Sequence, residues 1–403
     1  MYYGLSKIDI TPKEPVFQEG YGFRETKSES VHAPVYVKAL ALGKDFVVLC
    51  FDLCILDTEF VDALKARIPL PADRILVSYT HTHSGPALIA WLKHGPNPEY
   101  RAFALEAGAK AAQEALANLA EGELSFGVGE TYIGVKRNLA LPTGAEPERV
   151  IDRKLAVLTV RDTKGDIKVI WCEAACHAVI VTDYGISGDF PAQACKELEE
   201  AYPGAVAMYS QGCCGDTNPI LMHLDFDAAI MTGKVLANDV KNVIRFQSRP
   251  FRLDLASTIK EVTLPLGEDQ IDFFKGKAAD TDPVFHAYGE RMLAAIADGT
   301  APKTIPFRVM AVRLGKGIGM VTLEGEAVSF FARSMRERWA DDDLAVLGYS
   351  NGYRCYIPSI EKLHEGGYET TVTYEWGGFR APYTEEVEGI VTRAMDEAWK
   401  AVR

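Results

Sequence analysis

For its 403 residues, the chain is poor in cysteine and has no long apolar run. Its eight cysteines give too low a density for a fold held together by disulfide bonds. The longest apolar run, at 46–56, contains Asp52 and is much shorter than the roughly 20 apolar residues that cross a bilayer. We therefore expect no membrane span. The first residues contain no basic segment followed by an apolar one, which favours a cytoplasmic location.

Positive charge is also scarce. Lys and Arg total 43 against 56 Asp and Glu, which gives a formal net charge of −13. A protein that binds nucleic acid needs basic surfaces to replace the counterions of the phosphates, so this balance argues against such a partner. The expected partner is instead a small-molecule substrate. The composition leaves the oligomeric state open.

Strand-like and helix-like runs alternate along the chain, without an internal repeat. The clearest strands are expected at 35–42, 46–53, 74–83, 154–160, 307–314 and 318–322, and the clearest helices at 100–119, 225–243, 326–339 and 384–402. This alternation predicts an α/β protein with a mixed β-sheet core and flanking helices. No stretch marks a clean boundary, so we expect a single domain over 1–403. The most linker-like stretch, 279–306, itself contains a helical pattern.

A pair of histidines is the sharpest chemical feature. The run 78–86 reads Ser-Tyr-Thr-His-Thr-His-Ser-Gly-Pro and belongs to a predicted strand and the turn after it. Residues two apart on a strand point to the same side, so His81 and His83 are expected to face one site at the strand's carboxyl end. Open α/β sheets bind ligands at that end. Two imidazoles suit a metal such as zinc, but two histidines that satisfy hydrogen bonds in a loop explain the pattern equally well.

Three further polar residues stand at the ends of predicted elements. His177 ends the strand-like run 170–177 and needs a polar partner, which either a metal or a backbone carbonyl supplies. Glu326 opens a predicted helix, where the helix dipole alone already favours a carboxylate. Asp216 lies in a turn-rich loop and fits either a carboxylate that hydrogen-bonds a metal-binding histidine or a simple turn residue.

These motifs together resemble the neutral ceramidase family, in its zinc-dependent amidase domain. They occur in the family's order and cover most of the chain. The Thr-His-Thr-His-Ser-Gly-Pro run at 80–86 is highly specific, and so is the twelve-residue step from Tyr356 to Tyr368. The other matching elements are Asp9-Ile10-Thr11-Pro12, His177, Gly215-Asp216, Glu326, Asn351-Gly352-Tyr353 and Tyr368-Glu369.

The resemblance implies one catalytic zinc ion, bound by two histidines, one glutamate and one tyrosine. The residues at the matching positions are His81, His177, Glu326 and Tyr356. It also implies that His83 is the catalytic histidine and Tyr368 the catalytic tyrosine. The family has an arginine near the substrate, and Arg137, within 134–138, is the candidate for it.

The implied reaction is hydrolysis of an amide, or of an ester. Zinc lowers the pKa of a bound water to about 7 and so provides hydroxide at neutral pH. The oxyanion that develops on the attacked carbonyl needs preorganised donors, and the resemblance assigns these to Tyr368 and His83. Either residue can also pass a proton to the leaving amine.

The chain departs from the family in ways that bear on the substrate. Full-length ceramidases are considerably longer and carry a C-terminal immunoglobulin-like domain, which we do not expect within 1–403. The family's glutamate motif commonly begins with Pro, where this chain has Glu324. We therefore expect a small soluble N-acyl-type substrate rather than a long-chain lipid.

Two other functions compete with this one. An amidohydrolase-type barrel also uses a His-x-His pair on its first strand, but it needs more histidines at strand ends than the eight of this chain provide. A non-catalytic lipid- or carbohydrate-binding protein on the same fold would bind its ligand without metal. The presence of all six central residues favours the hydrolase.

Overall fold

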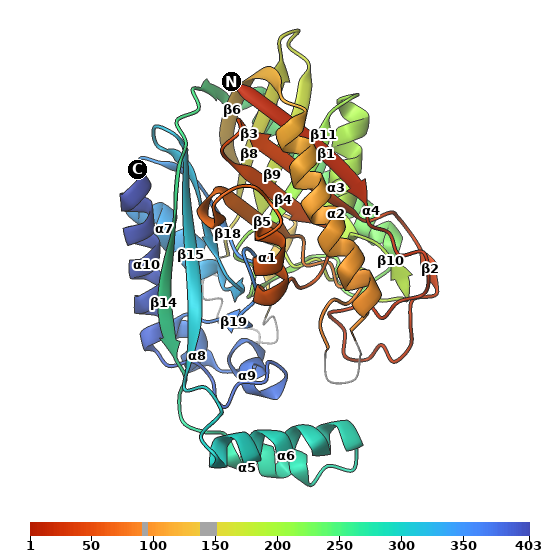
Figure 1. Cartoon of the computed structure of the whole chain (residues 1–403), viewed down its shortest axis with the longest axis vertical. Coiled ribbons are helices and arrows are strands. Elements are labelled where there is room, and N and C mark those ends of the chain that lie inside the picture. Colours follow the sequence, from red (N-terminus) through yellow and green to blue (C-terminus); the bar gives the residue numbers. More distant parts are fainter. Residues whose placement is uncertain (91–95, 138–150) are drawn as a thin grey trace, which may run out of the picture.

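Two β-sheets lie face to face, and helices cover the outer face of each (Figure 1). The computed structural model describes residues 1–90, 96–137 and 151–403. The larger sheet has nine strands and is mixed, because β4 and β5 run parallel, as do β9 and β11, whereas the other pairs are antiparallel. In spatial order its strands are β11 (Val206–Gln211), β9 (Ile167–Ala174), β8 (Lys154–Asp162), β6 (Ala120–Glu130), β1 (Tyr2–Asp9), β3 (Tyr36–Leu42), β4 (Val47–Phe51) and β5 (Ile75–Tyr79), with β13 (Arg249–Phe251) beside β6.

The smaller sheet has four strands. In order they are β14 (Ala256–Pro265), β15 (Thr304–Gly315), β16 (Ile318–Leu323) and β18 (Asp343–Leu347). The hairpin of β15 and β16 turns at Gly317, whose φ of 66° lies in the region that glycine adopts without steric cost. The hairpin expected at 307–314 and 318–322 is therefore confirmed.

The alternation of side chains along each strand explains why two sheets and two helical layers pack together. On β4, Val47, Leu49 and Phe51 face the helices, whereas Val48 and Cys50 face the smaller sheet. On β15, Val309 and Ala311 likewise face the helical side and Met310 and Val312 the larger sheet. Strands that are apolar on both faces need a partner layer on each side, and this architecture supplies both.

Helices from three parts of the chain cover the sheets (Figure 1). The outer face of the larger sheet is covered by α1 (Thr58–Lys65), α2 (Pro98–Ala117), α3 (Asp189–Ala201) and α4 (Phe226–Phe246). The outer face of the smaller sheet is covered by α7 (Ser329–Arg338) and α10 (Glu386–Val402). The α/β class with a mixed-sheet core and flanking helices is confirmed, and the open strand order shows that the barrel alternative is wrong.

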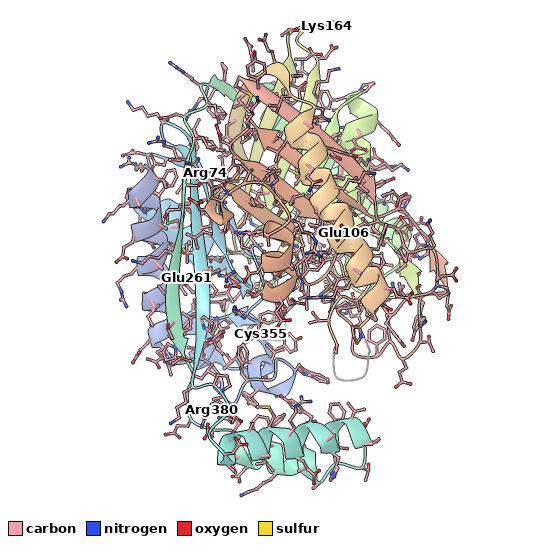
Figure 2. The ribbon with its side chains drawn as sticks, in the orientation of Figure 1. Arg74, Glu106, Lys164, Glu261, Cys355 and Arg380 are labelled. Carbon is pink, nitrogen blue, oxygen red and sulfur yellow. The ribbon has the colours of Figure 1, made fainter. Side chains whose placement is uncertain are left out.

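A helical hairpin separates β14 from β15 and projects from the body (Figure 1). It consists of α5 (Ile271–Ala278) and α6 (Pro283–Ala297), and α6 is the helix expected within 279–306. Arg380, labelled in Figure 2 at the base of this hairpin, is buried and joins its two ends. The guanidinium pairs with Asp269, before α5, and donates to the carbonyl oxygen of Ala301, after α6, at 3.1 Å.

Short pairings of two strands bring distant loops together beside the main sheets. They are β2 (Ser30–Val31) with β10 (Gly185–Ile186), β7 (Gly134–Lys136) with β12 (Thr217–Pro219), and β17 (Glu326–Ala327) with β19 (Tyr356–Ile357). The remaining helices are η1 (Ala72–Arg74), α8 (Ile360–Glu365) and α9 (Tyr368–Glu375). The helix expected at 326–339 begins only at Ser329, because Glu326 and Ala327 pair with β19 instead.

Within the described ranges, no helix combines the length and the hydropathy that crossing a bilayer requires. The expectation of no membrane-spanning helix agrees with this. The single domain over 1–403 and the cytoplasmic location stay predictions.

A buried ion cluster on α7 generates a prediction about stability. Arg336 pairs with Asp152 and, at 2.9 Å, with Glu173, and both carboxylates are buried. The substitution Arg336→Met should lower the free energy of unfolding by about 3–5 kcal/mol, because it leaves two buried carboxylates without their cation. Urea unfolding followed by circular dichroism measures the change.

Arg338 on the same helix is the matched control. It pairs with Asp396 at 3.0 Å in a setting that water reaches, so Arg338→Met should cost less than about 1 kcal/mol. Equal losses in the two variants would show that the cluster on Arg336 has no special role in stability.

Candidate metal centre

Four chain segments deliver the candidate metal ligands to one point. His81 follows β5 and His177 follows β9, both at the carboxyl ends of strands in the larger sheet. Glu326 and Tyr356 come from the other side, where the parallel pairing of β17 with β19 sets them opposite each other. All four side chains are buried. The structure thus brings together the four residues that the family resemblance implies as zinc ligands.

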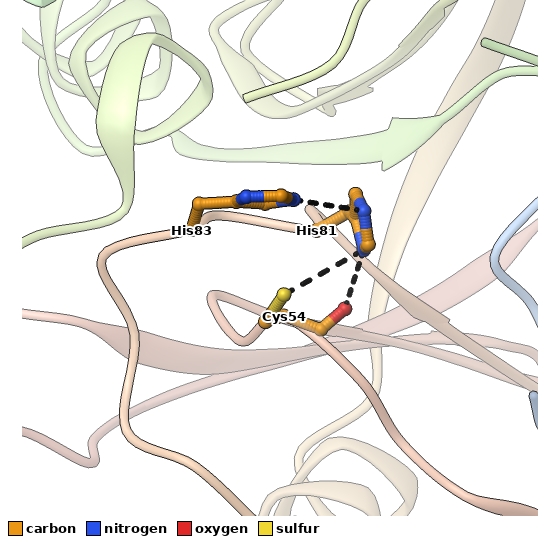
Figure 3. Close-up of side chains that lie close together, drawn as sticks. All are labelled: Cys54, His81 and His83. Atoms are coloured by element: carbon orange, nitrogen blue, oxygen red, sulfur yellow. Dashed lines mark hydrogen bonds between the residues drawn. The ribbon is translucent and has the colours of Figure 1, made fainter. Parts of the chain in front are cut away.

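The two histidines after β5 are neighbours, but not through the pleat of a strand. The strand was expected over 74–83, whereas β5 ends at Tyr79. His81 has a φ of 58°, a left-handed conformation that costs a non-glycine residue about 1 kcal/mol or more. This turn still brings the Nε2 atoms of His81 and His83 to 3.1 Å from each other (Figure 3). The expected proximity is confirmed, and the expected strand geometry is wrong.

The rings of the two candidate ligand histidines are fixed by backbone carbonyls. His81 Nδ1 lies 2.8 Å from the carbonyl oxygen of Cys54, and His177 Nδ1 lies 2.7 Å from that of Cys214. A carbonyl oxygen only accepts, so each Nδ1 carries the proton and each Nε2 presents its lone pair. Metal-binding histidines are typically oriented in this way.

The spacing of the donor atoms tests whether they fit a metal. Glu326 Oε2 lies 3.3 Å from His81 Nε2 and 3.2 Å from His177 Nε2. The Tyr356 hydroxyl lies 3.2 Å from His177 Nε2. A tetrahedral zinc ion with bonds of 2.0–2.1 Å has ligand atoms about 3.3–3.4 Å apart. Two imidazoles and a carboxylate at these separations fit one zinc ion, and the phenol beside His177 is a fourth donor.

A second cluster of candidate donors, Cys54 with His81 and His83, fits a metal poorly (Figure 3). The Cys54 Sγ lies 3.8 Å from His81 Nδ1, the nitrogen already bonded to the Cys54 carbonyl oxygen. Burial, with a contribution from Glu19, raises the pKa of the Cys54 thiol well above its usual value. A protonated thiol is a weak ligand. The cluster of His81, His177 and Glu326 is therefore the better metal site.

Glu326 is the negative charge of the centre. Burial opposes its ionisation, but His81 and His177 outweigh this and hold the pKa of Glu326 well below its usual range. Tyrosine hydroxyls complete its hydrogen bonding, since Tyr353 donates to Oε1 at 2.9 Å and Tyr349 to Oε2 at 3.3 Å. These two tyrosines escaped the sequence reasoning, because a tyrosine-rich loop reads as ordinary packing.

Arg137, the candidate for an arginine near the substrate, lies beside the candidate ligands. The pairing of β7 with β12 positions it, and its backbone N–H donates to the Asp216 carbonyl oxygen at 2.8 Å. Its guanidinium donates to the Tyr356 hydroxyl at 2.8 Å. Burial raises the pKa of Tyr356 well above its usual value, and the Arg137 charge acts against this rise. The arginine thus favours a phenolate at the site.

His83 and Tyr368 lie on the accessible side of the centre. Tyr368 opens α9, packs edge-on against the Tyr356 ring at 5.4 Å between centroids, and is 42% exposed. Burial and then the neighbouring His81 hold the pKa of His83 well below its usual value, so its ring is neutral at pH 7. Its Nδ1 is buried and has no hydrogen-bond partner among the described residues. Tyr368 is therefore open to a substrate, whereas His83 faces the centre through its Nε2 atom.

Asp216 supports the site indirectly. Its carboxylate accepts from the backbone N–H of Ser329 at 2.7 Å and from the Ser329 hydroxyl at 2.9 Å. It therefore fixes the start of α7, three residues after Glu326. Among the described contacts its carboxylate bonds no histidine, so neither role considered from the sequence describes it fully.

No protein-family model matches this sequence, and no curated protein sequence matches it. Its structure, however, is similar to solved ones. A crystal structure of neutral ceramidase from Pseudomonas aeruginosa aligns with a TM-score of 0.78 and 19% sequence identity, over 98% of this chain and 73% of that chain. A structure of ceramidase complexed with C2 aligns with a TM-score of 0.77 and 19% identity, over 98% and 74% of the two chains. The chain therefore has the neutral ceramidase fold.

Proposed function

We propose that this chain is a zinc-dependent hydrolase of the neutral ceramidase type, which cleaves the amide bond of a small N-acyl compound. One observation supports this most strongly. Donor atoms of His81, His177, Glu326 and Tyr356 converge, and three of their separations match a tetrahedral zinc site, on the fold of neutral ceramidase. An ester is the alternative bond, since a fold and a metal alone do not determine which bond is attacked.

The roles of the chain's residues follow from where they lie. A zinc ion bound by the four donors supplies Lewis-acid activation of water for attack on a carbonyl carbon. His83, neutral and adjacent to His81, accepts the proton of the attacking water and delivers it to the leaving nitrogen. The hydroxyl of Tyr368 donates to the carbonyl oxygen as negative charge develops on it. Arg137 holds the Tyr356 oxygen in place through its 2.8 Å hydrogen bond.

Metal content is the first test. The purified protein should contain about one zinc per chain by elemental analysis, since the four donors describe one site. His81→Ala and His177→Ala should each lose most of this zinc, because each removes a lone pair that a fixed ring directs into the site. His364→Ala is the matched control, since His364 is exposed and pairs with Glu385. Unchanged zinc in the first two variants would refute the ligand assignment.

Tyr368 is tested through turnover. Tyr368→Phe should keep its zinc and lower kcat on an N-acyl substrate by about 10²–10³, the usual effect of removing one oxyanion donor. Tyr374→Phe on the same helix should leave kcat unchanged, because its ring packs against Phe273 rather than at the metal centre. Unchanged turnover in Tyr368→Phe would remove the proposed role of this hydroxyl.

The same measurements separate a hydrolase from a non-catalytic binding protein. A hydrolase should lose turnover after chelation of zinc and after Glu326→Gln, which replaces the negative charge of the centre with a neutral amide. A binding protein would hydrolyse no amide or ester, with or without zinc. It would also keep its ligand affinity after the metal is removed.

A further inference from the structure

An apolar cavity adjoins the metal centre. Its volume is about 680 Å³, within the range of sites for small molecules. Tyr353 connects the two, because its side chain lines the cavity and its hydroxyl donates to Glu326 Oε1 at 2.9 Å. Cys355, labelled in Figure 2, also lines the cavity, on the part of the body that faces the helical hairpin.

One stripe of α9 leads from the metal centre into this cavity. Tyr368 contacts the Tyr356 ring, whereas Val372 and Trp376 line the cavity. Tyr368 and Val372 are four residues apart and share one face of α9, and Trp376, the residue directly after the helix, continues the stripe. At 1.5 Å per residue, the stripe is about 12 Å long. A substrate with its scissile bond at Tyr368 therefore has an apolar path of about this length beside it.

The α5–α6 hairpin forms the opposite wall. The residues of α6 that line the cavity are Pro283, Val284, Ala287, Tyr288 and Arg291, which fall on one face of that helix. Three contacts hold the hairpin against α9, and one of them is the packing of Phe273 on the Tyr374 ring. The Tyr288 hydroxyl donates to the Tyr374 carbonyl oxygen, and the rings of Phe285 and Trp376 lie 5.8 Å apart.

The cavity lining carries a positive charge and no negative one among the described residues. Arg291 is the one charged side chain among the described residues that line the cavity. It is exposed, its guanidinium lies 5.4 Å from the centre of the Tyr288 ring, and it forms no ion pair with any described residue. A cation without an acidic partner at the rim of an apolar cavity favours a ligand that combines an apolar body with an anionic group.

We propose that this cavity binds one arm of the amide substrate: an apolar chain or ring of about 12 Å that carries a carboxylate or similar anion, paired with Arg291. This inference rests on the proposed function, because it extends the same site. The arm belongs either to the acyl part or to the amine part of the substrate. The chemistry that the cavity recognises is the same in both cases.

Two matched pairs of substrates test the proposal and identify the arm. Octanoyl and suberoyl amides of a fluorogenic aminocoumarin differ only at the far end of the acyl arm. N-acetyl octylamine and N-acetyl aminooctanoate differ only at the far end of the amine arm. In one of the pairs, the carboxylate should raise kcat/KM about fivefold, as expected for one ion pair at a rim.

Substitutions in the cavity test whether Arg291 causes the preference for the substrate that carries a carboxylate. Arg291→Gln should abolish it and leave the neutral substrates within about twofold of wild type, since the gain comes from one ion pair. Lys275→Gln, on the same hairpin but outside the cavity lining, should retain it. Ala287→Phe should slow both long-armed substrates and spare an N-acetyl reporter, whereas Ala294→Phe on the exposed side of α6 should slow neither. The absence of a preference in both pairs, or its survival in Arg291→Gln, would overturn the proposal.

A binding measurement separates this inference from the proposed function. Tryptophan fluorescence of the zinc-depleted protein reports on octanoate and octanamide through Trp376, and Trp376→Phe should lose the signal. Octanoate should bind about fivefold more tightly than octanamide, and Arg291→Gln should remove the difference. If no amide is hydrolysed but this difference is present, the proposed function fails and the anion-binding cavity stands. Equal binding of the two ligands overturns the cavity proposal even in an active enzyme.

Discussion

The buried carboxylate of Glu326 is the interaction on which the rest of the site depends. A buried charge is tolerated only when surrounding groups stabilise it, and here they come from distant parts of the chain. Tyr349 and Tyr353 donate hydrogen bonds to its two oxygens, and the Nε2 atoms of His81 and His177 lie 3.3 Å and 3.2 Å from Oε2, where a shared metal ion would join the three groups. The loops after β5 and β9 and the segment from Tyr349 to Tyr356 must therefore fold around one point. The two sheets make this possible, because their packed inner faces bring the strand ends together at one end of the body.

Much of the fold was predictable, because most elements bury a regular apolar pattern. Strands β3, β4 and β8 of the larger sheet, the β15–β16 hairpin and helices α2, α4 and α10 all lie close to their predicted positions, whereas β1 and β13 were not predicted. The elements that the sequence placed wrongly are those set by contacts with distant segments. Glu326 has a helical context in the local sequence, yet it joins β17 because Tyr356 is paired with it. The loop around His81 continues an apolar strand in sequence, yet it turns after Tyr79 with a left-handed residue.

The candidate site likewise divides into residues that the sequence identifies and residues whose place depends on distant parts of the chain. Spacing and family resemblance identified His81, His83, His177, Glu326, Tyr356, Tyr368 and Arg137, and the structure brings these residues together, while their roles stay predictions. Tyr349 and Tyr353 were missed, because nothing in a tyrosine-rich loop indicates which hydroxyl meets a carboxylate. Arg291 was missed too, since its distance from an apolar cavity depends on how a helical hairpin lies against α9. Groups that act through long-range packing leave little signal in a single sequence.

Arg380 joins the two ends of the α5–α6 hairpin to the body, and this has a consequence for how such a protein diversifies. The two ends of the hairpin lie close together, where the chain leaves β14 and returns to β15. None of the residues assigned to the metal lies within the hairpin. A gene can therefore accumulate changes in these two helices, or exchange them as a unit, without altering the ligands or their hydrogen bonds. In the proposed function, the residues assigned to bond cleavage all lie outside the hairpin, whereas α6 supplies one wall of the substrate cavity. Selection can act on one of them while the other stays constant.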